Sequence, residues 1–296
     1  MKDKTIFTGA ATALVMPMNG DGRIDYASFG RLIEAQIDGG IDALLVLGTT
    51  GEACTLSDKE KREIIDFAAE KIDRRVPLIV GTGTNDTAKS VESSKYASDA
   101  GADALLIVTP YYNKATESGL VRHYLPIADS VGVPIIVYNV PSRTGVNVGM
   151  NVYRDLVRHG NIRAVKEASG NVSQAADIIA EFGGHLDVYS GCDDLTLPIL
   201  ALGGCGVISV ISNILPRDVH EMCAAFIGGD IERAKKMQLS QIGLCRALFS
   251  EVNPIPIKRA CAIMGICSSH VRLPLTEMSE RNEARLREAM SEYGII

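Results

Sequence analysis

The sequence contains no tryptophan, and aromatic residues occupy only 5% of its 296 positions. It also lacks an excess of basic residues: the formal net charge is −6, which argues against a nucleic-acid-binding surface. Charged residues make up 22% and are interspersed among an apolar fraction of 46%. This balance argues against intrinsic disorder and allows a sizeable hydrophobic core.

Disulfide and metal-binding patterns are missing as well. The number of cysteines is odd, and no two have C-x-x-C spacing, so we predict reduced thiols and a cytoplasmic protein. The seven are Cys54, Cys192, Cys205, Cys223, Cys245, Cys261 and Cys267. Asp193-Asp194 suggests a metal site, but no His or Glu stands at ligand spacing, so the pair is predicted to begin a helix instead. We therefore expect no metal.

No apolar run approaches the ~20 residues that a membrane-spanning helix needs. The first 18 residues, MKDKTIFTGAATALVMPM, contain lysines, an apolar run and small residues, as a signal peptide does. However, threonines and a glycine interrupt the run and Pro17 closes it. A first core strand over about residues 10–16 is the better interpretation, and we expect no membrane association.

Short runs rich in Leu, Ile and Val recur along the chain and end at Gly, Thr, Pro or Asn. Most are apolar on both faces, as buried parallel strands are. The eight runs are 11–17, 43–48, 77–83, 104–110, 134–140, 162–169, 187–192 and 206–210.

Amphipathic helices are predicted between these runs. The clearest spans 57–72, where Ser57 and Glu60 form a capping box. Eight strand–helix units in about 220 residues favour an α/β fold of the (β/α)₈ (TIM) barrel type. The alternative is a doubly wound open sheet, but its best candidate fingerprint, GTGTND at 81–86, lacks the third glycine.

The strand–helix alternation stops at about residue 216, and only helices are predicted after it. No Ser/Gly-rich linker separates this part from the rest. We therefore expect one domain over 1–296, with the barrel over 1–225 and a C-terminal helical extension over 226–296.

Unusual polar residues follow the predicted strands. In a (β/α)₈ barrel the active site lies at the carboxyl ends of the strands. Strands five and six should be neighbours about 4.8 Å apart, which brings the phenol of Tyr138 near the amine of Lys166. The candidates at strand ends and in the loops that follow are Thr49, Thr50, Tyr111, Tyr112, Tyr138, Arg143 and Lys166.

Lys166 is the most informative of these residues. Alternation along AVKEAS places it on the predicted barrel interior, where desolvation lowers the pKa of an amine. The neutral amine attacks carbonyl carbon and forms a Schiff base. The competing interpretation is a lysine paired with a nearby acid. Glu167 is a poor partner because adjacent strand residues point to opposite faces.

Each of the other candidates also has a purely structural interpretation. Tyr138 alone is more often a core phenol, and its ordinary pKa near 10 makes it a poor base without a relay of hydroxyls. Thr49 and Thr50 can cap a helix, although the backbone N–H groups around them also suit a carboxylate. Arg143 presents a forked cation that suits a second carboxylate, but an exposed loop arginine is usually only solvated.

Ordered motifs over nearly the whole chain resemble the class I pyruvate-dependent lyase and aldolase superfamily, and within it the dihydrodipicolinate synthase family. The motifs are GAATALVMP, GTTGEACTL, TPYYN, YNVPSRTG, KEASGN, GGCGVISV, NPIPIK and VRLPLT. The resemblance implies a TIM barrel, usually a homotetramer built as a dimer of dimers. It also implies condensation of pyruvate with L-aspartate 4-semialdehyde in the diaminopimelate route to lysine, without a metal or organic cofactor.

The resemblance assigns roles to individual residues. It implies that Lys166 forms the Schiff base and that Tyr138 moves protons, with Thr49 and a neighbouring subunit's Tyr112 completing the relay. Thr50 and the backbone of Ile208 would hold pyruvate, and Arg143 the carboxylate of the second substrate.

Two other functions stay open at this point. One is a pyruvate-dependent sugar-acid aldolase, of the sialic acid or keto-deoxy-gluconate type, which generally lacks the SRTG arginine. The other is a silent barrel that only binds a keto acid or a partner.

Overall fold

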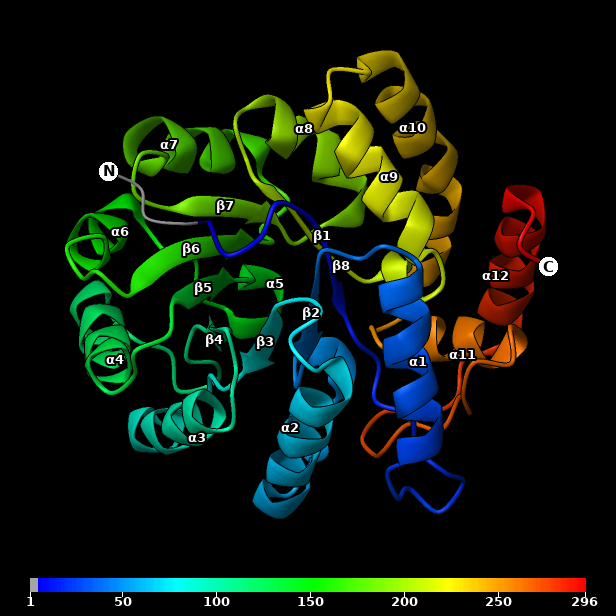
Figure 1. Ribbon diagram of the computed structural model, residues 1–296, viewed down its shortest axis with the longest axis horizontal. Coiled ribbons are helices and arrows are strands. Elements are labelled where there is room, and N and C mark those ends of the chain that lie inside the picture. Colours follow the sequence, from blue (N-terminus) through cyan, green and yellow to red (C-terminus); the bar gives the residue numbers. More distant parts are fainter. Residues whose placement is uncertain (1–4) are drawn as a thin grey trace. The chain divides into compact units, whose positions relative to one another are not determined.

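The computed structural model describes residues 5–296. Its eight strands pair in the order β1 to β8 and form a closed parallel barrel, as predicted (Figure 1). The open-sheet alternative is therefore wrong. The strands are β1 (Gly9–Ala13), β2 (Ala43–Val46), β3 (Leu78–Gly81), β4 (Ala104–Val108), β5 (Ile135–Asn139), β6 (Ile162–Glu167), β7 (Asp187–Ser190) and β8 (Gly206–Ser209).

The described residues divide into two compact units. We call residues 5–8 with 77–208 the middle unit, and residues 9–76 with 209–296 the flanking unit. The predicted division into a barrel over 1–225 and an extension over 226–296 stays a prediction. No helix within residues 5–296 is long and apolar enough to cross a bilayer.

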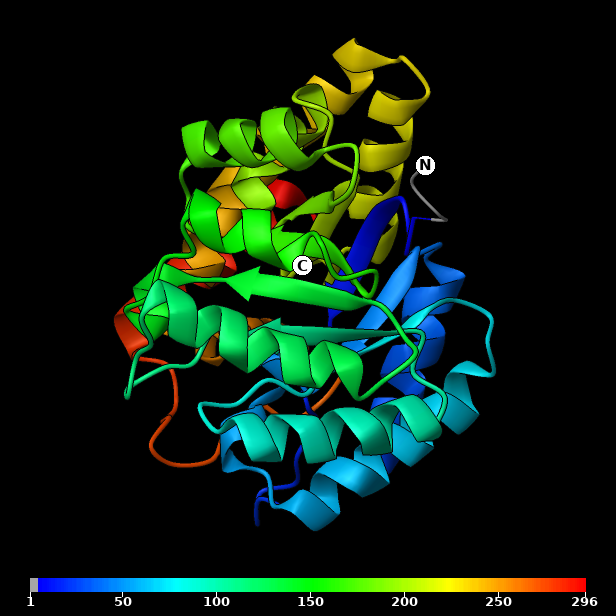
Figure 2. The ribbon, with the colours of Figure 1, turned by 90° about the vertical axis from the view of Figure 1, so that its left-hand side faces the viewer.

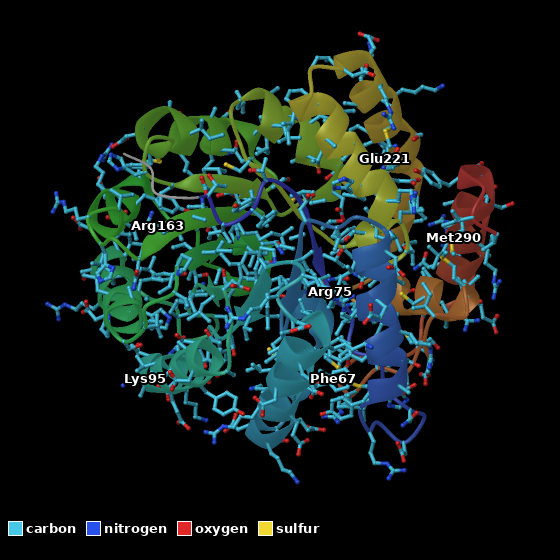
Figure 3. All side chains as sticks on the ribbon, viewed as in Figure 1. Phe67, Arg75, Lys95, Arg163, Glu221 and Met290 are labelled. Carbon is cyan, nitrogen blue, oxygen red and sulfur yellow. The ribbon has the colours of Figure 1, made fainter. Side chains whose placement is uncertain are left out.

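In the middle unit, four helices lie side by side along the outer face of the strands (Figure 2). They are α3 (Thr87–Asp99), α4 (Glu117–Asp129), α6 (Met150–Leu156) and α7 (Val172–Phe182). Side chains fill the space between strands and helices, whereas charged ones such as Lys95 on α3 lie at the periphery (Figure 3). The strands are almost wholly buried, which explains why their sequences are apolar on both faces.

The flanking unit contains β1, β2 and most of the long helices. Helices α1 (Tyr26–Asp38) and α2 (Asp58–Ile72) follow its two strands. After β8 the chain is helical, as predicted: α9 (Pro216–Ile227), α10 (Ile231–Leu248), α11 (Ile255–Ile263) and α12 (Glu280–Tyr293). Short helices complete the fold, namely α5 (Pro141–Thr144), α8 (Thr196–Ala201) and the 3-10 turns η1 (Thr49–Gly51), η2 (Ala53–Thr55), η3 (Asp193–Leu195) and η4 (Ile211–Asn213).

Local sequence signals account for many of these boundaries. The capping box at the start of α2 is present, because Ser57 Oγ accepts from the Glu60 N–H while the Glu60 carboxylate accepts from the Ser57 N–H. Asp193 does begin a helical turn, η3, and α8 follows it. The first strand ends at Ala13 rather than near residue 16, so the apolar run overstates its length.

A glycine of the GTGTND segment also has a structural explanation. A Cβ at Gly83 would lie 2.4 Å from the backbone nitrogen of Val108 on β4. Only glycine permits this close approach of the two neighbouring strands. Close packing against β4 therefore explains this glycine without a dinucleotide.

Candidate functional site

The middle unit holds Lys166 near the carboxyl end of β6. Strand register pairs Lys166 with Tyr138 on β5 and with Tyr189 on β7. The Lys166 side chain is buried, and its Nζ lies 4.6 Å from the centroid of the Tyr138 ring. The Lys166 amine and the Tyr138 ring therefore lie next to each other, as expected.

The surroundings of Lys166 lower its pKa from 10.5 to about 8. Burial is the largest cause, because removing an ammonium from water disfavours the charged form. The charge of Asp193 acts in the opposite direction, and the Arg143 guanidinium lowers the pKa further. The shift raises the neutral fraction of the amine at pH 7 about 300-fold.

Glu167, the next residue on β6, is buried but bonded to other groups. Its carboxylate accepts hydrogen bonds from Asn139 Nδ2 at 2.9 Å and from the Ser169 N–H at 2.7 Å. Gln174 Nε2 lies 3.4 Å from the same carboxylate. These donors occupy the carboxylate, in agreement with the expectation from strand alternation that Glu167 is not the partner of Lys166.

Arg143 lies on the short helix α5, directly after β5. The side chain is exposed, whereas the next residue, Thr144, is buried. The Thr144 hydroxyl lies within hydrogen-bond distance of the Val140 and Val146 carbonyls, at 3.2 and 3.0 Å. Gly145 ends the helix with a positive φ of 67°. The SRTG segment therefore holds an accessible guanidinium near enough to act on the charge of Lys166.

Tyr112 follows β4 and differs from the other predicted residues. Its side chain is 91% exposed, and its backbone has a positive φ of 69°. Within this chain the ring does not pack against the Lys166–Tyr138 pair. Ile208, by contrast, is fully buried on β8.

Thr49 and Thr50 belong to the flanking unit, where they form the turn η1 directly after β2. The predicted strand over 43–48 ends early, at Val46, because Leu47 adopts a left-handed φ of 56°. Thr50 is buried, and its Oγ1 accepts a hydrogen bond of 3.0 Å from Asn253 Nδ2. Thr49 is partly exposed.

Three residues that fix this turn were not predicted as functional. Glu52, at the end of the turn, forms a buried ion pair of 2.7 Å with Lys258 on α11, and Asn253 precedes the same helix. Asn253 and Lys258 are part of the motif NPIPIK, but no local pattern relates them to Thr50 and Glu52, more than 200 positions away. The available signal was a lysine, Lys258, within the largely apolar segment IPIKRACAI.

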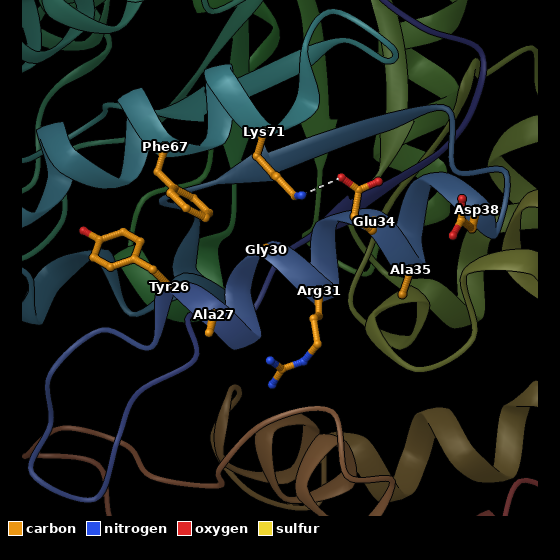
Figure 4. Close-up of a pocket in the computed structure, with 9 residues that line it drawn as sticks. All are labelled: Tyr26, Ala27, Gly30, Arg31, Glu34, Ala35, Asp38, Phe67 and Lys71. Carbon is orange, nitrogen blue, oxygen red and sulfur yellow. Dashed lines mark ion pairs between the residues drawn. The ribbon is translucent and has the colours of Figure 1, made fainter.

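Other features of the molecule do not belong to this site. Within residues 5–296, no group of three or more His, Cys, Asp and Glu side chains is arranged to hold a metal ion. A hollow of about 620 Å³ lies between α1 and α2 in the flanking unit (Figure 4). Apolar surface and the ion pair between Lys71 and Glu34 line it, and none of the predicted site residues does.

The fold and site define a (β/α)₈-barrel protein with a desolvated lysine on its sixth strand, next to a tyrosine on its fifth. Comparison with known proteins identifies the family within this class. Residues 6–293 match the dihydrodipicolinate synthetase family, and the chain belongs to that family.

Individual relatives agree with this assignment. The chain is 48% identical over 293 residues to a 4-hydroxy-tetrahydrodipicolinate synthase of Acetivibrio thermocellus, covering 99% of both chains. The dihydrodipicolinate synthase structure from Aquifex aeolicus is similar with a TM-score of 0.95 and 43% identity, over 98% of this chain and 99% of that one. A third relative is the chloride-inhibited enzyme from Acinetobacter baumannii complexed with pyruvate, with a TM-score of 0.96 and 42% identity over 99% and 100%.

Proposed function

We propose that the protein is a 4-hydroxy-tetrahydrodipicolinate synthase, which condenses pyruvate with L-aspartate 4-semialdehyde. The observation that carries the proposal is the buried Lys166 amine, whose pKa is lowered to about 8, beside the Tyr138 ring. Relatives of the same name match along the full chain, and the Acinetobacter baumannii relative is complexed with pyruvate.

The reaction we propose begins at the ketone of pyruvate. The neutral Lys166 amine attacks the carbonyl carbon, and loss of water gives an imine. Loss of a methyl proton converts the imine into an enamine, because the protonated imine nitrogen accepts the electron pair. The enamine carbon then attacks the aldehyde of the second substrate. The amino group of that substrate finally attacks the imine carbon, closes the ring and releases Lys166.

We assign the proton transfers to Tyr138, since strand register places it directly beside Lys166. Thr49 and Tyr112 complete the proposed relay. Because Tyr112 is 91% exposed within its own chain, we propose that it acts in the site of a neighbouring subunit, in a homotetramer. An exposed aromatic residue held in a left-handed conformation supports this role, since such strain is often kept for function.

Substrate binding is assigned to three further residues. We propose that Thr50 and the backbone of Ile208 hold the carboxylate of pyruvate, and that Arg143 holds the carboxylate of aspartate semialdehyde. The exposed, forked guanidinium of Arg143 suits bidentate contact with a carboxylate. It also favours this substrate over the sugar acids used by related aldolases.

A coupled assay tests the proposal directly. The protein is given either pyruvate with aspartate semialdehyde, and formation of the condensation product is followed, or a keto-deoxy sugar acid alone, and its cleavage to pyruvate is followed. We expect turnover with aspartate semialdehyde and about 100-fold less with the sugar acids, because a charged hydrogen bond worth up to about 3 kcal/mol discriminates by roughly that factor. Preference for a sugar acid would reassign the protein to the aldolases, and no turnover would indicate a silent barrel.

The role of Tyr138 has its own test. Tyr138→Phe keeps the ring beside Lys166 but removes the hydroxyl that moves protons. We expect kcat to fall by about 10²–10³-fold, within the range of general acid–base catalysis. Reductive trapping of pyruvate on Lys166 should decrease less than kcat does. A variant with wild-type kcat would remove Tyr138 from the mechanism.

A further inference from the structure

The contact between Asn253 and Thr50 connects two segments of the flanking unit that lie far apart in the sequence. Asn253 Nδ2 lies 3.0 Å from Thr50 Oγ1. Both residues are buried, at 5% and 3% exposure. A hydrogen bond in such a site is shielded from water, so its direction follows from which of the two atoms carries a proton.

The chemistry of the two groups sets that direction. An amide nitrogen donates hydrogen bonds and does not accept them, whereas a hydroxyl has one proton and two lone pairs. Thr50 Oγ1 therefore accepts from Asn253, and the single proton of Thr50 stays available for another acceptor. An ionised carboxylate is an acceptor only, so it requires this orientation of the hydroxyl.

The turn that carries Thr50 is held by separate contacts. The Glu52 carboxylate is paired with Lys258 Nζ at 2.7 Å and also accepts from the Arg272 N–H at 3.0 Å. Arg272 Nη1 in turn donates to the carbonyl of Thr55 at 2.8 Å. These contacts hold the turn in place without Asn253. The effect of Asn253 is therefore on the orientation of the Thr50 hydroxyl rather than on the position of the turn.

We propose that Asn253 is a positioning residue that orients the Thr50 hydroxyl as a donor toward the carboxylate of the keto-acid substrate. This inference rests on the function proposed above, in which Thr50 binds pyruvate. Asn253 does not touch the substrate in this account. It acts through Thr50, so its contribution disappears when the Thr50 hydroxyl is absent.

A double-mutant cycle tests this dependence. We expect Asn253→Ala and Thr50→Val each to raise KM for pyruvate about 10-fold, with kcat changed less than about 3-fold and KM for aspartate semialdehyde unchanged. The double variant should be no worse than Thr50→Val alone, whereas independent roles would multiply the two losses. Thr50→Ser, which keeps the hydroxyl, should restore most of the affinity and keep its sensitivity to Asn253→Ala.

A matched pair elsewhere in the same unit controls for destabilisation. Thr12 Oγ1 donates to Gln36 Oε1, and both residues are buried. Gln36→Met removes an amide–hydroxyl contact together with the hydrogen bonds that Gln36 Nε2 donates to the carbonyls of Ser212 and Asn213. It should lower the melting temperature without raising KM for pyruvate. If Asn253→Ala does not fold, Asn253→Asp matches the original volume and presents only acceptors to Thr50. It should raise KM at least as much as Ala is expected to.

The outcomes separate this inference from the function on which it rests. Multiplied losses in the double variant, or a fall in melting temperature with unchanged KM for pyruvate, would overturn the role of Asn253 and leave the proposed function intact. A wild-type protein that neither turns over pyruvate nor is trapped by it on reduction would refute both.

Discussion

Two buried lysines in this protein have opposite surroundings. Lys258, in the flanking unit, is fully buried and forms an ion pair of 2.7 Å with Glu52, whose side chain is also buried. Lys166, in the middle unit, is 5% exposed and lies over the ring of Tyr138. Its pKa falls to about 8, because burial outweighs the attraction of Asp193.

The difference shows that the groups around a buried amine determine whether it is suited to a structural ion pair or to nucleophilic attack. At Lys258 a carboxylate lies in direct contact, and the ion pair holds together two segments that lie far apart in the sequence. An aromatic ring and the charge of Asp193 do not compensate for the desolvation of Lys166, so its amine releases its proton more easily, as the proposed nucleophile must. Burial alone therefore does not identify a reactive lysine.

The largest expected effect comes from removing Lys166, the proposed nucleophile. Lys166→Met should lower turnover by on the order of 10⁴-fold or more, because the proposed mechanism requires its amine to form the imine. The fold should persist, since an apolar side chain suits the site. Steady-state assays and circular dichroism check both parts. Activity within 10-fold of the wild type would show that the two lysines do not differ in the way proposed.

Removing the structural lysine should instead affect stability. Lys258→Met leaves the Glu52 carboxylate buried without its cation, which should lower the free energy of unfolding by about 3–5 kcal/mol. Adding Glu52→Gln should restore part of the loss. The surface pair of Lys59 with Glu63, side chains 85% and 48% exposed, is the control, and Lys59→Met should cost less than about 1 kcal/mol. Equal losses at both sites would contradict the account; denaturant titration measures them.

The desolvation of Lys166 also predicts a dependence of stability on pH. An unfolded lysine keeps its proton up to about pH 10.5, whereas the folded one releases it near pH 8. Between these values the unfolded state binds more protons, so this group makes stability rise with pH. Well below pH 8 the cost of burying the charged amine is present in full. It lowers the free energy of unfolding by about 3 kcal/mol.

The measurement compares wild type with Lys166→Met in denaturant titrations at several pH values. The stability advantage of the variant should be constant from pH 6 to 7 and should shrink from pH 8 to about 10.5. An advantage that grows over that window would have the wrong sign for a lowered pKa.

The smallest effect concerns the carboxylate of Asp193. Asp193 raises the pKa of Lys166, so Asp193→Asn should lower it further. The acid limb of the pH profile of kcat/KM for pyruvate should move to lower pH by about 0.5–1 unit. No movement, or movement to higher pH, would show that burial acts without a contribution from Asp193.

Local patterns in the sequence predicted most of the fold. The apolar runs identified all eight strands, and Ser57 with Glu60 marked the start of α2. Strand ends were less predictable. The run over 11–17 overstated β1, because an apolar segment stays buried after strand pairing stops, as Val15 and Met16 do.

The site was predictable where it depends on strand order. Alternation placed Lys166 inside, and the neighbouring strands brought Tyr138 beside it. The anchoring of Thr50 by Asn253 was not predictable, because that contact spans 203 positions and arises only from tertiary packing. The catalytic and binding roles of the predicted residues stay predictions.

The central claim is that Lys166, buried and without an ion pair to any carboxylate among residues 5–296, is the nucleophile. Its most direct test is reductive trapping. The protein is incubated with pyruvate and borohydride, digested, and its peptides are weighed by mass spectrometry. The account predicts a reduced pyruvate adduct on Lys166 and none on Lys258. An unmodified Lys166, or an adduct on another side chain, would contradict it.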